Sequence, residues 1–202
     1  MKVLIGIIFS YVMGSIPFAY IITKLKTSLD IREIGSKNMG SGNVFHSVGI
    51  KEGLLVLFLD AGKGCLSTIF SYYILKLPPH LVLLVSFFAV LGHICPIFLK
   101  FKGGRGAATT LGIQITFLFS YLREKGFFVF LPILLIYLLL IITTRSQVIS
   151  LFFLFPFYPI LLYAVSRDVK IFLVNLFFVI ALLLSGLPSF KREFKKLKEG
   201  KR

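Results

Sequence analysis

The sequence predicts an all-α integral membrane protein with about seven transmembrane helices. Of its 202 residues, 57% are hydrophobic and 15% are charged, whereas a typical soluble domain is about 45–50% apolar and about 25% charged. The apolar residues gather in runs that approach the length needed to cross a bilayer, about 20 residues. The 23 Phe lie inside these runs, so lipid is their expected neighbour, and nucleic-acid binding is disfavoured despite a net charge of +15.

The first three predicted spans occupy the N-terminal half of the chain. The first begins after Lys2, runs on without a clear signal-peptidase site, and contains Pro17, which predicts a kink. The second and third are separated by the turn residues Pro78 and Pro79. These spans cover residues 3–23, 53–75 and 81–99.

The other four spans follow with shorter connections. Gly126 marks the turn between the fourth and the fifth. The fourth and the seventh are short for a bilayer crossing. These spans cover residues 107–122, 127–144, 148–165 and 171–187.

The distribution of basic residues predicts the topology. An odd number of spans places the termini on opposite sides, and sixteen of the 23 Lys and Arg then fall on one face. The positive-inside rule makes that face cytoplasmic and the N-terminus external. We therefore expect a single multi-pass domain over residues 1–202 in the cell membrane, with a basic cytoplasmic tail over 190–202.

Two cytoplasmic segments are candidates for phosphate binding. Residues 35–49 read GSKNMGSGNVFHSVG, and glycines with short polar donors suit close approach to an anion. Residues 102–106 place two cations around a glycine pair, just before a predicted helix N-terminus. The alternatives are a flexible connector for the first segment and a tight turn with topological charges for the second.

Three ionisable residues fall inside predicted spans. Asp60 and Lys63 are three residues apart on one helix face, which favours a structural ion pair. His93 is predicted to lie about two turns inside the third span, either as a functional group or as a packing residue. We expect all three to support a site rather than to form it. The sequence has no metal-ligand spacing, and neither a metal nor a cofactor is expected.

Four segments in order resemble the bacterial membrane family of acyl-phosphate glycerol-3-phosphate acyltransferases, usually called PlsY. They are GSIPFAYIITKLK from Gly14, DIREIGSKNMGSGNV from Asp30, FLDAGKG from Phe58 and GHICPIFLKFKGGRGAAT from Gly92. The resemblance implies a seven-span fold with a cytoplasmic active site. It also implies an enzyme of phospholipid synthesis that transfers a fatty acyl group from acyl phosphate to the 1-hydroxyl of glycerol 3-phosphate, giving lysophosphatidic acid and phosphate.

The resemblance assigns site residues position by position. It implies catalytic roles for Ser36 and Arg105, with the arginine in place of the family's lysine. His46 stands where the family has an arginine, and Lys37 replaces a glycine. The implied substrate-phosphate ligands are Asn38, Gly40, Asn43, His46, Lys102, Gly103 and Gly104.

The third family motif, close to His-Arg-Glu-Asn, is not matched in the tail. Phe190 and Glu193 occupy the histidine and asparagine positions when the segments are aligned on Gly200. This departure leaves two alternatives open. One is a divergent paralogue with another phosphorylated acceptor or acyl donor, and the other is a non-catalytic protein that binds lipid or transports an anion. The expected partners are the two substrates and membrane lipids, without nucleic acid or an obligate protein partner.

Overall fold

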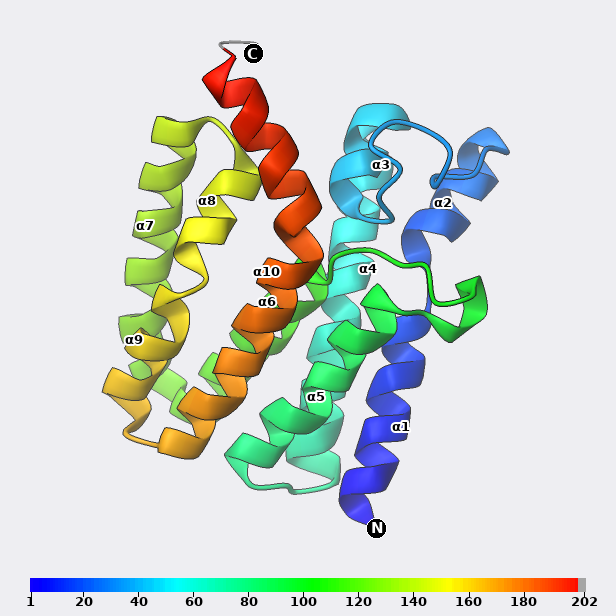
Figure 1. Cartoon of the computed structure of the whole chain (residues 1–202). Helices are drawn as coiled ribbons and strands as arrows, with labels where there is room; N and C mark the ends of the chain where they lie inside the picture. Colours follow the sequence, from blue (N-terminus) through cyan, green and yellow to red (C-terminus); the bar gives the residue numbers. More distant parts are fainter. Residues whose placement is uncertain (200–202) are drawn as a thin grey trace. The chain divides into compact units, whose positions relative to one another are not determined.

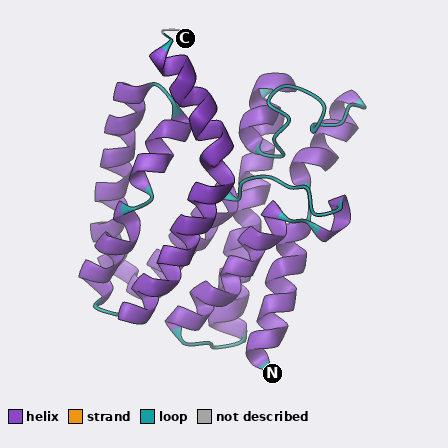
Figure 2. Ribbon diagram, in the orientation of Figure 1, coloured by secondary structure: helices purple, strands orange, loops and turns teal. Residues whose placement is uncertain are grey.

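The computed structural model describes residues 1–199, which form helices and connecting loops and contain no strand (Figure 2). Contacts between Cα atoms divide the chain into two compact units, Met1–Phe117 and a second that starts at Leu118. The all-helical prediction is therefore confirmed for the described residues. Residues 200–202, the end of the predicted tail, lie outside them.

The first unit holds the segments that carry the predicted site (Figure 1). Its helices are α1 (Lys2–Ser15), α2 (Phe18–Thr27), α3 (Ser41–Ser47), α4 (Ile50–Ile69), α5 (Pro79–Ile94) and α6 (Ala107–Phe117). A π-helical turn, Phe70–Ile74, extends α4, and a short 3-10 helix, Ile97–Leu99, follows α5.

The predicted kink in the first span is confirmed as a complete break. Pro17 has no N–H to donate, so Met13 O accepts from Ile16 N at 3.3 Å, and Phe18 N donates to Ile16 O at 3.1 Å. The helix restarts as α2 and continues to Thr27, four residues beyond the predicted end.

Glycines let the helices of this unit pack backbone to backbone. A Cβ at Gly14 on α1 would clash with the Ala89 carbonyl of α5, and one at Gly92 on α5 would clash with Tyr11 O of α1. Gly64 of α4 lies in the same way against a backbone carbonyl of α6, that of Thr109. Such small-residue contacts are the usual way for helices to approach closely in lipid.

The long segment between α2 and α4 has a core of its own. Ile31 and Met39 in the loop are buried together with Val44 of α3, Ala19 of α2 and Val56 of α4. These apolar contacts explain how a glycine-rich loop is held in one conformation.

The second unit contains the α-helices that follow Leu118. They are α7 (Phe127–Thr144), α8 (Gln147–Leu154), α9 (Phe157–Ser166) and α10 (Val169–Lys198), preceded by a π-helical turn, Leu118–Leu122, and a 3-10 turn, Arg123–Gly126. The sixth predicted span is broken into α8 and α9 around Pro156. The predicted tail is helical as far as Lys198, because α10 continues into it.

Six helical stretches within residues 1–199 are long and apolar enough to cross a membrane. One of them, Ala107–Thr144, has 38 residues. As one straight helix it would measure about 57 Å, against a hydrocarbon core of about 30 Å. It contains α6, the turn at Arg123–Gly126 and α7, and so corresponds to the fourth and fifth predicted spans.

Candidate active site

Asn43 of α3 organises the first glycine-rich loop, residues 35–40. Its Oδ1 accepts the backbone N–H of Ser36 at 2.8 Å and the Ser47 hydroxyl at 3.3 Å. Its Nδ2 donates to the carbonyls of Ile31 and Ile34, both at 3.1 Å. Since Asn43 is buried and both ends of its amide are engaged, its side chain shapes the loop.

The other predicted residues of the first loop lie nearer the surface. Ser36 is exposed, Asn38 is half-buried, and Gly40 directly precedes α3. His46 is exposed on α3 itself. Their placement is compatible with ligand binding, and their roles stay predictions.

The second loop, residues 102–106, lies against the end of α5. Gly104 N donates to the carbonyl of His93 at 3.0 Å. A Cβ at Gly103 would clash with that same carbonyl, and one at Gly104 would clash with the His93 ring and with Met39 O. The glycine pair is therefore required because α5 and the first loop both approach it closely. Arg105 is half-buried, and α6 begins two residues later, as predicted.

The two loops meet around a surface hollow of about 350 Å³. This volume falls within the range of about 300–1,000 Å³ that is usual for small-molecule sites. The residues that line it are Asp30, Arg32, Glu33, Lys37, Met39, Lys102 and Gly103. The structure thus brings Lys102 and Gly103 together with Lys37, whereas Ser36, Asn38, His46 and Arg105 are not among the lining residues.

Sequence reasoning missed Asp30 and Arg32, which form one wall of the hollow. Arg32 Nη2 and Nε donate to Asp30 Oδ2 at 2.6 and 3.1 Å, and Nε also donates to Oδ1 at 3.0 Å. These hydrogen bonds hold the pKa of Asp30 below its usual value and raise the pKa of Arg32. A usable signal in the sequence was the pair of opposite charges on either side of the apolar Ile31, and in the structure residues 31–33 form a turn.

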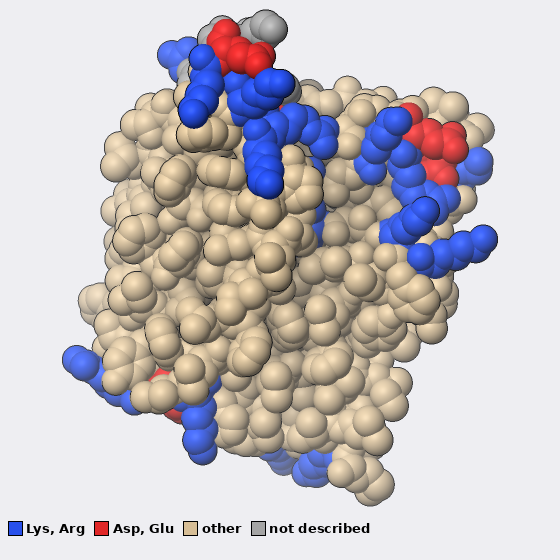
Figure 3. All heavy atoms as spheres, in the orientation of Figure 1, with Lys and Arg blue, Asp and Glu red and all other residues tan. Residues whose placement is uncertain are grey.

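Figure 3 shows where charged side chains gather in each unit. In the first unit, basic and acidic side chains mix near α2 and the loop that follows it. In the second unit, basic side chains surround the last turns of α10.

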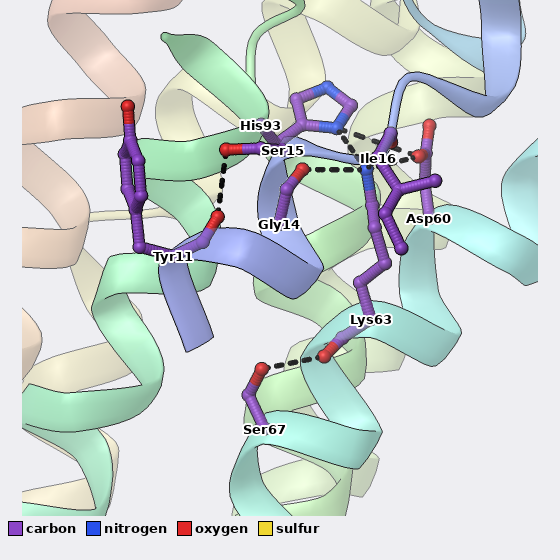
Figure 4. Close-up of polar contacts among 8 residues, drawn as sticks. All are labelled: Tyr11, Gly14, Ser15, Ile16, Asp60, Lys63, Ser67 and His93. Carbon is purple, nitrogen blue, oxygen red and sulfur yellow. Dashed lines mark hydrogen bonds and ion pairs between the residues drawn. The ribbon is translucent and has the colours of Figure 1, made fainter. Parts of the chain in front are cut away.

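Asp60, Lys63 and His93 form one buried cluster (Figure 4). Lys63 Nζ lies 2.8 Å from Asp60 Oδ1 and 3.2 Å from His93 Nδ1. It also donates to Gly14 O at 3.0 Å and to Ile16 O at 2.9 Å. The predicted pairing of Asp60 with Lys63 is confirmed. His93 lies in the last turn of α5, which ends at Ile94, while the candidate membrane span continues to Leu99, six residues beyond His93.

The sequence analysis also did not identify the carbonyls of Gly14 and Ile16 at the helix break as acceptors for Lys63. Pro17 was the signal that could have found them, because a proline leaves carbonyls of the preceding turn without their helical donors. Within residues 1–199, no group of three or more His, Cys, Asp or Glu side chains is placed to hold a metal ion.

Phe190 on α10 makes ring contacts where the family motif has a polar residue. Its ring stacks on Phe152 at 4.2 Å and lies 5.6 Å from Phe194, centroid to centroid. The aromatic side chain therefore contributes packing within the second unit. Glu193 follows three residues later and is half-buried.

Nearly the whole chain is similar to known proteins. A family model described as glycerol-3-phosphate acyltransferase matches residues 4–200. Glycerol-3-phosphate acyltransferase 2 of Dehalococcoides mccartyi is 33% identical over 198 residues, which cover 98% of this chain and 90% of that protein. The glycerol-3-phosphate acyltransferase of Bacillus subtilis is 41% identical over 133 residues, covering 65% and 68%.

Solved structures agree with the sequence relatives. The crystal structure of PlsY (YgiH), an integral membrane glycerol 3-phosphate acyltransferase, in its glycerol 3-phosphate form, superposes with a TM-score of 0.81 at 27% identity. The match covers 100% of this chain and 94% of that one. The crystal structure of the same protein in its lysophosphatidic acid form superposes with a TM-score of 0.79 at 26% identity. The chain therefore belongs to the glycerol-3-phosphate acyltransferase family.

Proposed function

We propose that this protein transfers a fatty acyl group from acyl phosphate to the 1-hydroxyl of glycerol 3-phosphate, releasing phosphate and lysophosphatidic acid for phospholipid synthesis. The observation that carries the proposal is the meeting of the two glycine-rich loops around one hollow that includes Lys37 and Lys102. Both substrates carry a phosphate, so a site for the reaction needs cations and close backbone approach at one place. The family relationship supports the same conclusion.

The chemistry needs positioning more than a strong catalytic group. The 1-hydroxyl oxygen attacks the acyl carbonyl carbon, the bond from that carbon to the phosphate oxygen breaks, and inorganic phosphate leaves. A phosphate oxygen of a substrate takes the hydroxyl proton, so no side chain becomes the nucleophile. Donors that stabilise the developing oxyanion then supply much of the rate.

We assign roles to the two loops on this basis. The loop that Asn43 holds presents Ser36 and Asn38 to the acyl phosphate. Lys102, Arg105 and the glycine pair receive the phosphate of the acceptor, together with His46, which is a weaker and pH-dependent ligand than the family's arginine.

The location follows from the charge distribution. With seven crossings and the N-terminus outside, both loops face the cytoplasm, where the positive-inside rule places most of the Lys and Arg. The protein is then a multi-pass enzyme of the bacterial cell membrane. The basic end of α10 is suited to anionic lipid headgroups, at about 1 kcal/mol per basic residue near the surface.

One observation favours a second function, in which the acceptor or the donor differs. Phe190 supplies a packed aromatic ring where the family motif has a histidine. A site without that polar group suits a different polyol phosphate or a different acyl donor.

The test is turnover by the purified protein in detergent. Acyl phosphate and glycerol 3-phosphate are mixed with it, and lysophosphatidic acid and free phosphate are both measured. We expect product from the wild type and loss of product in Ser36→Ala and Arg105→Ala, whereas Arg123→Ala, at the exposed turn before α7, serves as the matched control.

The other outcomes separate the alternatives. Phosphate release that does not depend on glycerol 3-phosphate indicates another acceptor or donor. If no polyol phosphate among several gives turnover, the proposed enzymatic function is wrong. The remaining alternative is then a protein that binds lipid or transports an anion.

A further inference from the structure

The buried cluster of Asp60, Lys63 and His93 lies next to both loops and to the helix break at Pro17. None of its three side chains lines the hollow. Lys63 and Asp60 are 2% and 1% exposed. Burying two charges is costly, and the pair is stable only where other polar groups complete its surroundings. The position of those groups indicates what the cluster holds in place.

The ammonium of Lys63 is fully engaged inside the protein. It has three protons and lies within 3.2 Å of four acceptors: two carbonyls, the Asp60 carboxylate and the His93 ring. Groups inside the protein therefore balance its charge, and the ammonium does not bind a ligand in the hollow.

The two carbonyls belong to the break between α1 and α2. Gly14 O is in the last turn of α1, and Ile16 O follows that helix. Carbonyls at a helix C-terminus lack intrahelical donors and carry the negative end of the helix dipole. Lys63 thus acts as a tethered cation that caps a helix interrupted by Pro17.

His93 carries the contact onward to the second loop. Its Nδ1 edge lies 3.2 Å from Lys63 Nζ and 3.5 Å from Asp60 Oδ1, which leaves the Nε2 edge for the second loop. That Nε2 edge lies directly against Gly104, and the His93 carbonyl accepts the Gly104 N–H. A change in the ring's orientation would therefore move the glycine pair.

The first loop meets the same cluster through Met39. Met39 and Gly104 line one small cavity with Asp60, Lys63 and His93, and its volume of about 10 Å³ is close to the minimum for one water molecule. The space is too small for a substrate, so the cluster acts through the loops.

We propose that Lys63 is a positioning residue, which through His93 fixes Gly103 and Gly104 in the geometry that binds the acceptor's phosphate. This inference rests on the proposed function, because it assigns the second loop to the acceptor. A purely structural lysine would stabilise the fold without distinguishing one substrate from the other.

The kinetic test replaces Lys63 by Met and measures both substrates separately. We expect the KM for glycerol 3-phosphate to rise about tenfold or more, while the KM for acyl phosphate changes by less than about threefold. Lys2→Met makes the same replacement at an exposed residue at the start of α1 and is the matched control. If the single variant fails to fold because Asp60 is left as an unpaired buried charge, the same measurements are made on the double variant Asp60→Asn/Lys63→Met, which removes both charges.

The second test is hydrogen exchange, which does not depend on turnover. Amides of residues 103–106 are expected to exchange about tenfold faster in the folded Lys63 variant, with α4 and α5 still protected. If the wild type shows no turnover, the proposed function fails, and exchange in the second loop still decides this inference. Unchanged exchange there, or an equal change in the two KM values, overturns it.

Discussion

The side-chain carbonyl of Asn43 accepts the backbone N–H of Ser36 at 2.8 Å. A residue on α3 thereby fixes the loop residue to which the family resemblance gives a catalytic role. The same amide donates to the carbonyls of Ile31 and Ile34, so it joins the glycine-rich loop to the segment before it. An acceptor and a donor are both needed at this position, which a carboxylate of the same shape cannot supply.

Asn43→Asp is therefore expected to damage the loop although it changes the volume little. It keeps the bond from Ser36 but places a carboxylate against two carbonyls that lose their donor. Leaving such buried groups unpaired costs about 2–3 kcal/mol. Thermal unfolding in detergent measures the loss, and Asn38→Asp, the same change at a half-buried residue of the loop, should cost much less. Equal losses in the two variants would contradict this account.

Gly64 and Gly62 on α4 form a matched pair for the helix contact with α6. A Cβ at Gly64 would clash with Thr109 O, whereas one at Gly62 would meet no atom within 4 Å. We expect Gly64→Ala to destabilise the protein by about 1–3 kcal/mol through forced separation of the helices. Gly62→Ala should stabilise it by about 0.5–1 kcal/mol, because alanine favours the helix. The melting temperatures of the two variants test this prediction. A shift of the same sign in both would contradict the close contact of α4 with α6 at Gly64.

Lys37 combines an unfavourable backbone with a useful charge. It lines the hollow and has φ of 59°, in the left-handed region that suits glycine. Lys37→Gly should preserve or raise stability while raising the KM for glycerol 3-phosphate about three- to fivefold at low salt. The effect should shrink as salt increases, because the hollow is open to solvent.

Lys100→Gly is the control for that experiment. Lys100 is exposed with φ of 53° and is not among the residues that line the hollow. Lys100→Gly should relieve the left-handed backbone in the same way as Lys37→Gly. It should leave the KM for glycerol 3-phosphate as in the wild type. A similar rise in KM for both variants would show that the charge of Lys37 has no specific role.

Stability at acid pH should report the pair of Asp30 and Arg32. Arg32 lowers the folded-state pKa of Asp30, so the unfolded chain takes up the proton more readily. The pair therefore stabilises the fold above the ordinary carboxyl pKa of about 3.9, and this contribution is lost as the pH falls through the lowered value. The difference in melting temperature between wild type and Asp30→Asn should be constant above about pH 5 and vanish at lower pH.

Arg32→Gln tests whether the partner is the cause. It should remove the same pH-dependent contribution, and the double variant should lose no more than either single variant. Additive losses would assign the effect of Asp30 to another cation, such as Lys24, which also lowers its pKa.

The sequence predicted the spans well because the bilayer imposes a length and a composition on each. The fifth span, 127–144, coincides with α7, and α6 starts at Ala107, where the fourth span was predicted to start. Errors arose where helices stop for local reasons. Pro156, for example, divides the sixth span into α8 and α9.

The sequence by itself determined the membrane class, the family and the two loops that carry glycine and cations, since these depend on composition and on short contiguous motifs. Only the tertiary structure decided which residues meet. It joined Lys37 to Lys102 around one hollow and added Asp30 and Arg32 to its wall. It also placed Lys63 against carbonyls 47 and 49 residues away. Such contacts depend on how helices pack against each other, which no local pattern in the sequence specifies.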